Sequence, residues 1–78
     1  MPMRELVAFM ARALVRDPAA VEVSEDAAER ERVLRLRVAP GDTGRVIGRE
    51  GRTARALRTV LAVASARTGA RARLDIAN

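Results

Sequence analysis

The first segment of the chain has the hydrophobic pattern of an amphipathic helix. Between Met3 and Leu14, apolar residues recur at spacings of three and four, which places them on one helical face. We expect the helix to end before Asp17-Pro18, because the residue preceding a proline is disfavoured in the helical conformation. The apolar positions are Met3, Leu6, Val7, Met10, Ala13 and Leu14.

Alternation of polar and apolar residues predicts two strands in the next part of the chain. Residues 21–24, Val-Glu-Val-Ser, alternate in this way and indicate a short strand. Residues 25–32 are mostly charged, and we expect a solvated turn there. Residues 33–38 give the clearest strand pattern. Its inward side chains are Leu34, Leu36 and Val38, and its outward side chains are Arg35 and Arg37.

A break and a short helix are predicted after this strand. Residues 39–41, Ala-Pro-Gly, interrupt the alternation. Asp42 or Thr43 is a suitable N-cap for a helical turn over residues 44–47, and a loop with two glycines follows.

The end of the chain predicts a long helix and a third strand. Residues 53–67 carry an apolar stripe at helical spacing, and Gly69 lies where a helix C-cap glycine belongs. Residues 71–76 alternate again, with Ala72, Leu74 and Ile76 inward. The stripe of the helix comprises Ala54, Leu57, Val60, Leu61 and Ala64.

These elements predict a two-layer α+β domain in the order helix, strand, strand, short helix, long helix, strand. Three strands with helices on one face can bury a single small core. The expected core residues are Met3, Leu6, Phe9, Met10, Leu34, Leu36, Val46, Leu57, Leu61 and Leu74.

The composition excludes most enzymatic chemistry. The 78 residues contain no Cys and no His, and only two serines, so most catalytic triads and transition-metal sites are excluded. We therefore expect no enzyme, no metal site, no cofactor and no small-molecule substrate. No signal peptide or membrane span is visible, and we expect a cytoplasmic protein.

The positive charge is concentrated in the second half of the chain. Residues 1–42 carry seven Arg against eight acidic residues, a net charge of −1. Residues 43–78 carry eight Arg against two acidic residues, a net charge of +6. Every basic residue of the chain is Arg, which codon bias explains. Each of these arginines can still donate two hydrogen bonds to one phosphate. Such a basic half is expected of a nucleic-acid-binding protein.

A motif of two glycines, Gly48 and Gly51, lies near the start of this basic half. A P-loop and a Rossmann fingerprint both require a glycine at the position of Val46, so neither motif is present. The remaining use of such a loop is close approach to a phosphate chain, because glycine has no Cβ and tolerates positive φ.

The run from Gly44 to Arg58 resembles the Val-Ile-Gly-x-x-Gly core of K-homology (KH) domains, whose two-glycine loop clamps about four nucleotides of single-stranded RNA. The expected element order is similar to the type II, prokaryotic arrangement of this fold. The resemblance extends over essentially all 78 residues and matches the small stand-alone bacterial KH proteins of the KhpA family. It implies one KH domain over residues 1–78 and a non-enzymatic RNA-binding function.

The resemblance also implies how the loop would contact RNA. The glycines would let the sugar-phosphate backbone approach, and the amides around Arg49, Glu50 and Arg52 would point at phosphates. The apolar pair before the loop would form a groove floor beneath the bases, with the opposite wall from residues 36–38. The implied RNA-binding residues are Gly48, Arg49, Glu50, Gly51, Arg52, Arg45, Ile47, Val46 and Arg55.

Several of these residues also have a purely structural interpretation. The glycines could form only a tight turn between helices, and at least one of Val46 and Ile47 is expected in the core. Arg55 and Arg58 are as consistent with solvated helix charge as with ligand contacts. Glu50 departs from the family pattern, because many members carry a basic or neutral residue there. It would weaken phosphate binding or pair with a neighbouring arginine, which keeps open a protein-interaction subunit with weak or no RNA affinity.

The resemblance further implies partners. It implies a homodimer or a complex with KhpB (Jag), a larger protein that joins a KH domain to a second nucleic-acid-binding domain. It also implies an RNA chaperone or post-transcriptional regulator linked to cell-envelope elongation and division. Single-stranded DNA remains an alternative ligand, because a clamp on phosphates does not need a 2′-OH.

Overall fold

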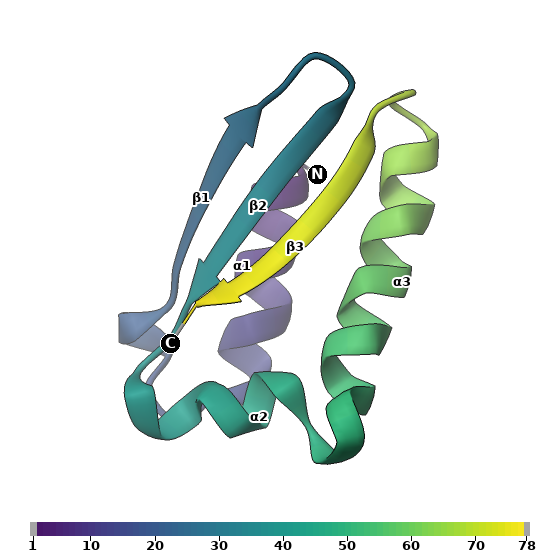
Figure 1. Cartoon of the computed structure of the whole chain (residues 1–78). Helices are drawn as coiled ribbons and strands as arrows, with labels where there is room; N and C mark the ends of the chain where they lie inside the picture. The colour runs from purple at the N-terminus through teal and green to yellow at the C-terminus, as the bar shows by residue number, and fades with distance from the viewer. Residues whose placement is uncertain (1, 78) are drawn as a thin grey trace.

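The computed structural model describes residues 2–77, which form the predicted three-stranded sheet with helices packed on one face (Figure 1). Three single turns of 3-10 helix, Pro18–Ala20, Pro40–Asp42 and Arg49–Gly51, lie in the connections. The helices and strands are α1 (Met3–Leu14), β1 (Glu22–Ala27), β2 (Glu31–Arg37), α2 (Thr43–Ile47), α3 (Arg52–Ala66) and β3 (Arg71–Ala77).

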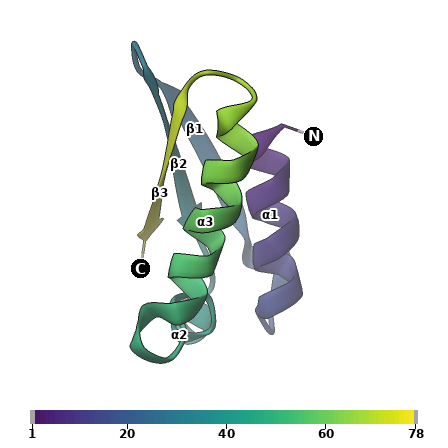
Figure 2. The same ribbon diagram turned by 90° about the vertical axis from the view of Figure 1, so that its right-hand side faces the viewer.

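β2 is the central strand of the sheet. It pairs antiparallel with β1 and parallel with β3, so that β1 and β3 form the two edges. The parallel pairing requires a crossover connection, which α2 and α3 provide. Figure 2 shows α1 and α3 side by side on the same face of the sheet. None of the helices within residues 2–77 has the length and apolar character needed to cross a membrane.

The core lies between this sheet face and the two long helices. Leu34 and Leu36 of β2 are fully buried, and their neighbours in the sequence, Arg35 and Arg37, are exposed, as predicted. Most of the expected core residues are buried, and Leu6 and Met10 pack against the core while remaining half-buried. The core cluster comprises Met3, Val7, Ala11, Val21, Leu34, Leu36, Val38, Val46, Leu57, Leu61 and Leu74.

Phe9 is not in the core, so that prediction was wrong. Its side chain is 65% exposed. The buried stripe of α1 runs through Val7 and Ala11, and Phe9 lies between them in sequence, on the other side of the helix. Position on the helix therefore outweighs the size of the aromatic ring.

The two antiparallel strands are longer than the pattern predicts. Residues 25–32 were expected to form a turn, but β1 runs to Ala27 and β2 begins at Glu31. The charges in this segment pair across the strands: Arg32 Nη1 lies 2.7 Å from Glu25 Oε2, and Arg35 pairs with Asp26. Cross-strand ion pairs allow charged residues to extend a ladder that hydrophobic alternation does not reveal.

Candidate nucleic-acid interface

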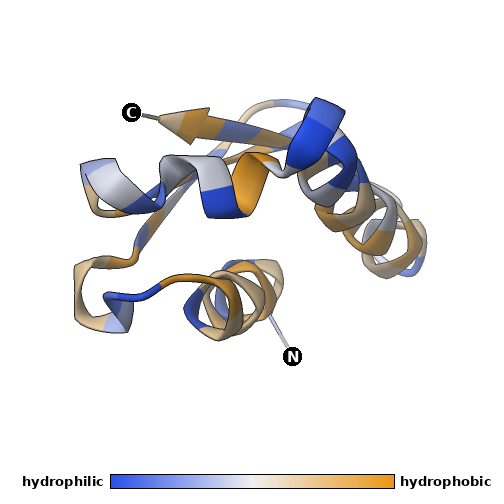
Figure 3. Ribbon diagram, turned by 90° about the horizontal axis from the view of Figure 1, so that it is seen from below, coloured by the Kyte–Doolittle hydropathy of each residue, from blue (hydrophilic) through white to orange (hydrophobic). Residues whose placement is uncertain are grey.

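The loop between α2 and α3 contains three residues with positive φ. Gly48 has φ 77° and ψ 170°, Glu50 has φ 58° and ψ 24°, and Gly51 has φ 74° and ψ 12°. Glu50 is the one residue other than glycine with positive φ in the part of the chain that the structure describes. Seen from below in Figure 3, this hydrophilic segment follows the hydrophobic end of α2 and projects from the molecule.

Gly48 is required by a close approach as well as by its dihedral angles. A Cβ at this position would lie 2.2 Å from Thr53 Oγ1 and 2.8 Å from the Thr53 backbone nitrogen. Nothing lies within 4 Å of the corresponding Cβ position at Gly51. Thr53, at the start of α3, lies so close to Gly48 that only glycine fits there. The sequence pattern does not reveal this role of Thr53.

Two of the loop amides are free to bind a ligand. The Gly51 N–H donates to the Gly48 carbonyl at 3.1 Å, and the Arg52 N–H donates to the Arg49 carbonyl. The Arg52 amide is therefore already used by the turn that closes the loop. Within residues 2–77, the N–H groups of Arg49 and Glu50 have no backbone acceptor. These two donors lie just before the N-terminus of α3, where the helix dipole favours an anion.

The arginines around the loop differ in how they are held. Arg52 Nη2 lies 3.3 Å from Glu50 Oε2, with both side chains largely exposed. Arg45 Nε lies 3.7 Å from Asp42 Oδ1, one turn back along α2 and away from the loop. Arg49 and Arg55 form no ion pair within the described residues. The loop therefore has one unneutralised arginine of its own, Arg49, and a second one on the first turns of α3.

The apolar residues that precede the loop do not form a groove floor together. Val46 is fully buried in the core, so its side chain supports the loop from beneath and cannot touch a ligand. Ile47 is half-buried and remains available at the surface. The expected opposite wall around residues 36–38 is also wrong, because β2 is the central strand and Leu36 and Val38 are buried beneath the helices.

β3 is the strand against which the helix that follows the loop packs. Figures 2 and 3 show the loop and the end of β3 on the same side of α3. β3 is an edge strand, and α3 packs against it. We call the area formed by residues 48–58 and the free edge of β3 the loop–β3 surface. This neighbour follows from the parallel pairing of β2 with β3 through the crossover, which the hydrophobic pattern alone does not give.

Asp42 anchors the beginning of α2. Its side chain was expected to cap the helix, but it makes no capping bond; instead its Oδ2 accepts a hydrogen bond of 3.0 Å from the Asp17 N–H. Thr43 makes no cap either and donates to the Pro40 carbonyl. Asp42 is only 3% exposed. This buried carboxylate therefore ties the connection after α1 to the segment that carries the loop.

The open face of the sheet is electrically balanced. The Asp75 carboxylate accepts hydrogen bonds from Arg73 and raises its pKa, and the charge of Glu31 adds to this effect. Arg35 pairs in the same way with Asp26. By strand alternation this face carries Arg35, Arg37, Arg71 and Arg73, and Glu22, Asp26, Glu31 and Asp75. The excess positive charge of the chain therefore lies on the crossover and not on the sheet.

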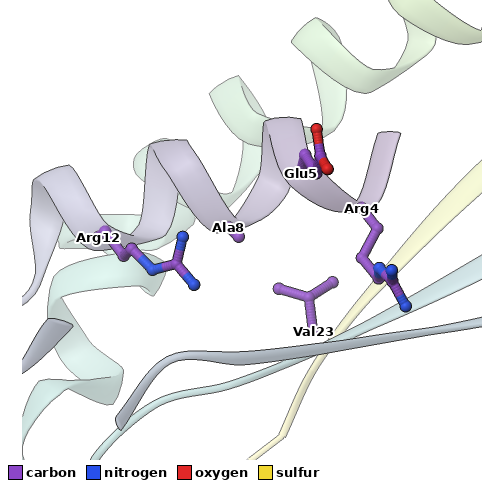
Figure 4. Close-up of a pocket in the computed structure, with 5 residues that line it drawn as sticks. All are labelled: Arg4, Glu5, Ala8, Arg12 and Val23. Atoms are coloured by element: carbon purple, nitrogen blue, oxygen red, sulfur yellow. The ribbon is translucent and has the colours of Figure 1, made fainter. Parts of the chain in front are cut away.

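A hollow between α1 and β1 also has arginines at its rim. It has a volume of about 470 Å³, and Figure 4 shows Arg4 and Arg12 at its two ends with Ala8 and Val23 between them. It lies at the β1 edge, across the sheet from the loop–β3 surface. Glu5 offsets part of its charge. Within residues 2–77 no group of acidic side chains is arranged to hold a metal ion.

Comparison with known proteins places residues 4–76 in the family described as "KhpA/KhpB, KH domain". An "RNA-binding protein KhpA" of Treponema pallidum is 47% identical over 72 residues, covering 92% of this chain and 90% of the relative. The protein of that name from Clostridium acetobutylicum is 42% identical, covering 95% of this chain and 99% of the relative. The one from Halalkalibacterium halodurans is 46% identical, covering 95% and 97%. These relatives are named as binding proteins and not as enzymes.

Proposed function

Because the chain belongs to the KhpA/KhpB family of KH domains, we propose that it binds short single-stranded RNA through the loop–β3 surface, without enzymatic activity. The observation that carries this proposal is the pair of free N–H groups at Arg49 and Glu50, held just before the start of a 15-residue helix. The open space at Gly51 leaves room for a sugar-phosphate backbone to approach these donors, while the space left by the missing Cβ of Gly48 is filled by Thr53.

The charge of the crossover supports the same site. Residues 43–66 carry five Arg against Glu50 as their one acidic residue. Since the open sheet face is balanced, a polyanion is drawn to the loop and not to the sheet. In our proposal Arg49 and Arg52 bind phosphates, Arg55 adds charge along the strand, and Ile47 offers an apolar contact to a base. Val46 and Arg45 act only indirectly, through the core and through Asp42.

The experiment that tests this proposal compares two double variants of equal charge. Arg49→Gln with Arg52→Gln alters the loop, and Arg12→Gln with Arg67→Gln alters two exposed arginines elsewhere. Binding of a labelled hexauridylate is measured against salt concentration. We expect a log–log slope of roughly −2 to −3 for the wild type, and a slope shallower by about 1.4 for the loop variant.

The control variant should keep the wild-type slope. An equal decrease of the salt slope in both double variants would mean that the protein attracts RNA by its net charge alone. If the wild type shows no salt-sensitive binding while the protein still self-associates, the alternative of a protein-interaction subunit replaces this proposal. Repeating the titration with a deoxyribose oligonucleotide separates RNA from single-stranded DNA.

Self-association is a second part of the proposal. Phe9, Val60 and Val63 are large apolar side chains that remain exposed, by 65%, 42% and 68%. A hollow of about 490 Å³ between α1 and α3, lined by Leu6 among others, lies on the same side. Such a surface suits a homodimer in which Phe9 of each copy enters the hollow of the other, since so small a domain gains stability from association.

The family resemblance supports the remaining parts of the proposal. They are that the chain is a single KH domain, that it acts in the cytoplasm as an RNA chaperone or post-transcriptional regulator, and that it works with a KhpB-type partner in cell-envelope elongation and division. Sequencing of RNA crosslinked to the protein in cells, with and without the partner, tests this part directly.

A further inference from the structure

Arg58 is held at the free edge of β3 by a neutral acceptor. Its Nε and Nη2 donate to the Leu74 carbonyl oxygen at 3.4 and 3.2 Å. Figure 1 shows α3 on the side of β3 that faces away from β2. Two donors from one edge of the planar guanidinium converge on one oxygen, and this fixes the plane of the group.

The other edge of the same guanidinium stays free. Arginine has five N–H donors, and the pair formed by Nη1 and the second hydrogen of Nη2 points away from Leu74. Arg58 is exposed, and it forms no ion pair with any acidic residue in the described range. By contrast, Arg52 and Arg45 are each engaged by a carboxylate. Arg58 therefore presents a full charge and two parallel donors in a fixed orientation.

The position of Arg58 on α3 determines which part of a bound strand its free N–H groups can reach. Arg52, Arg55 and Arg58 are three residues apart, so each step advances about 4.5 Å along α3 and turns back by about 60°. The row leads from the loop to the β3 edge. If the phosphates of a strand lay on the loop amides of Arg49 and Glu50, a base that turned toward β3 would meet Arg58, which is held at the Leu74 carbonyl.

We propose that Arg58 determines base specificity by donating both free N–H groups to O6 and N7 of a guanine. Guanine offers two neighbouring acceptors on this edge, whereas adenine offers one acceptor and one donor. The edge is open in single-stranded RNA. This inference rests on the RNA-binding function proposed above and names the ligand as a single strand with guanine at one defined position.

The test places one guanine at each position of a hexauridylate in turn. We expect one position to tighten binding by about 10-fold, the size of a good bidentate base contact. Replacing that base with 7-deazaguanine, which lacks the N7 acceptor, should remove the gain. Arg58→Lys keeps the charge but not the planar pair of donors, so it should remove the gain from guanine. Arg12→Lys, at the opposite edge of the sheet, should keep the gain.

The outcomes separate this inference from the proposed function. Salt-sensitive binding of hexauridylate without a gain from guanine at any position overturns the role of Arg58 and leaves RNA binding intact. An equal loss for all oligonucleotides in Arg58→Lys assigns the arginine to a phosphate and also overturns it. Absence of any salt-sensitive binding overturns the proposed function itself. If Arg58→Lys fails to fold, the wild-type protein still tests the inference, because equal affinity for guanine and 7-deazaguanine would overturn the contact with N7.

Discussion

Gly48 and Gly51 carry the same side chain for different physical reasons. The φ and ψ of Gly48 lie in a region that is open essentially to glycine alone, and its missing Cβ makes room for Thr53. Gly51 is in the ordinary left-handed region, which asparagine also adopts, and has open space around it. The loop therefore depends on one strict glycine and one more tolerant position.

Substitution at the two positions should differ in cost. We expect Gly48→Ala to lower the free energy of unfolding by about 2 kcal/mol or more, since strain and contact with Thr53 act together. We expect Gly51→Asn to cost less than about 1 kcal/mol. Urea denaturation of each variant measures both values. Equal costs would show that the Thr53 contact does not constrain the loop.

Glu50 opposes the function of the loop in which it lies. Its backbone amide is one of the two free donors, while its carboxylate pairs with Arg52 beside them. We expect Glu50→Gln to tighten hexauridylate binding by about 2- to 5-fold at low salt and to lose this gain as salt rises. Fluorescence anisotropy measures the change, with Glu22→Gln on the open sheet face as the control of equal charge. Unchanged affinity would mean that the carboxylate faces away from the RNA.

Among the elements, α2 is the one whose start is joined to a distant part of the chain by a buried carboxylate. It has only five residues, and Asp42 joins its start to the backbone of Asp17. We expect Asp42→Ala to lower the free energy of unfolding by about 1–3 kcal/mol, because a buried hydrogen bond is lost. Asp42→Asn keeps an acceptor and should cost less.

Asp26→Asn is the matched control for this change. Its carboxylate pairs with Arg35 on the exposed sheet face, and such a pair contributes less than about 1 kcal/mol. Urea denaturation with linear extrapolation compares the three variants. If Asp26→Asn costs as much as Asp42→Ala, the contact with Asp17 is not what places α2.

The type and order of the elements could be predicted because each has a clear periodicity. The predictions are wrong where contacts between residues far apart in the sequence determine the length of an element or the role of a side chain. The length of β1 depends on ion pairs with β2, and the role of Asp42 depends on an N–H group 25 residues away. In the loop, the glycines and arginines follow from the motif. The neighbouring strand and the use of the Arg52 amide depend on the three-dimensional closure of the crossover.

For the whole molecule, the basic and the exposed apolar residues come from different stretches of the chain. The loop–β3 surface includes residues 48–58, while the exposed apolar side chains lie on α1 and on the later turns of α3. We expect Val63→Glu and Phe9→Glu to abolish self-association and to change RNA affinity by less than about 2-fold, since a charge in an apolar contact is costly. Sedimentation equilibrium measures the association, and Ala62→Glu, exposed beside the patch, is the control. A monomeric wild type at all concentrations would contradict the proposed dimer.

The parallel pairing of β2 with β3 has a consequence for the folding pathway. Leu34 pairs with Leu74 across the whole crossover, whereas the β1–β2 hairpin closes over a three-residue turn. Distant pairings form slowly because the loop-closure entropy must be overcome first. We therefore expect β3 to dock last, and a nascent chain from which β3 has not yet emerged to lack the loop–β3 surface. Ligand recognition would then begin only when translation of the domain is complete.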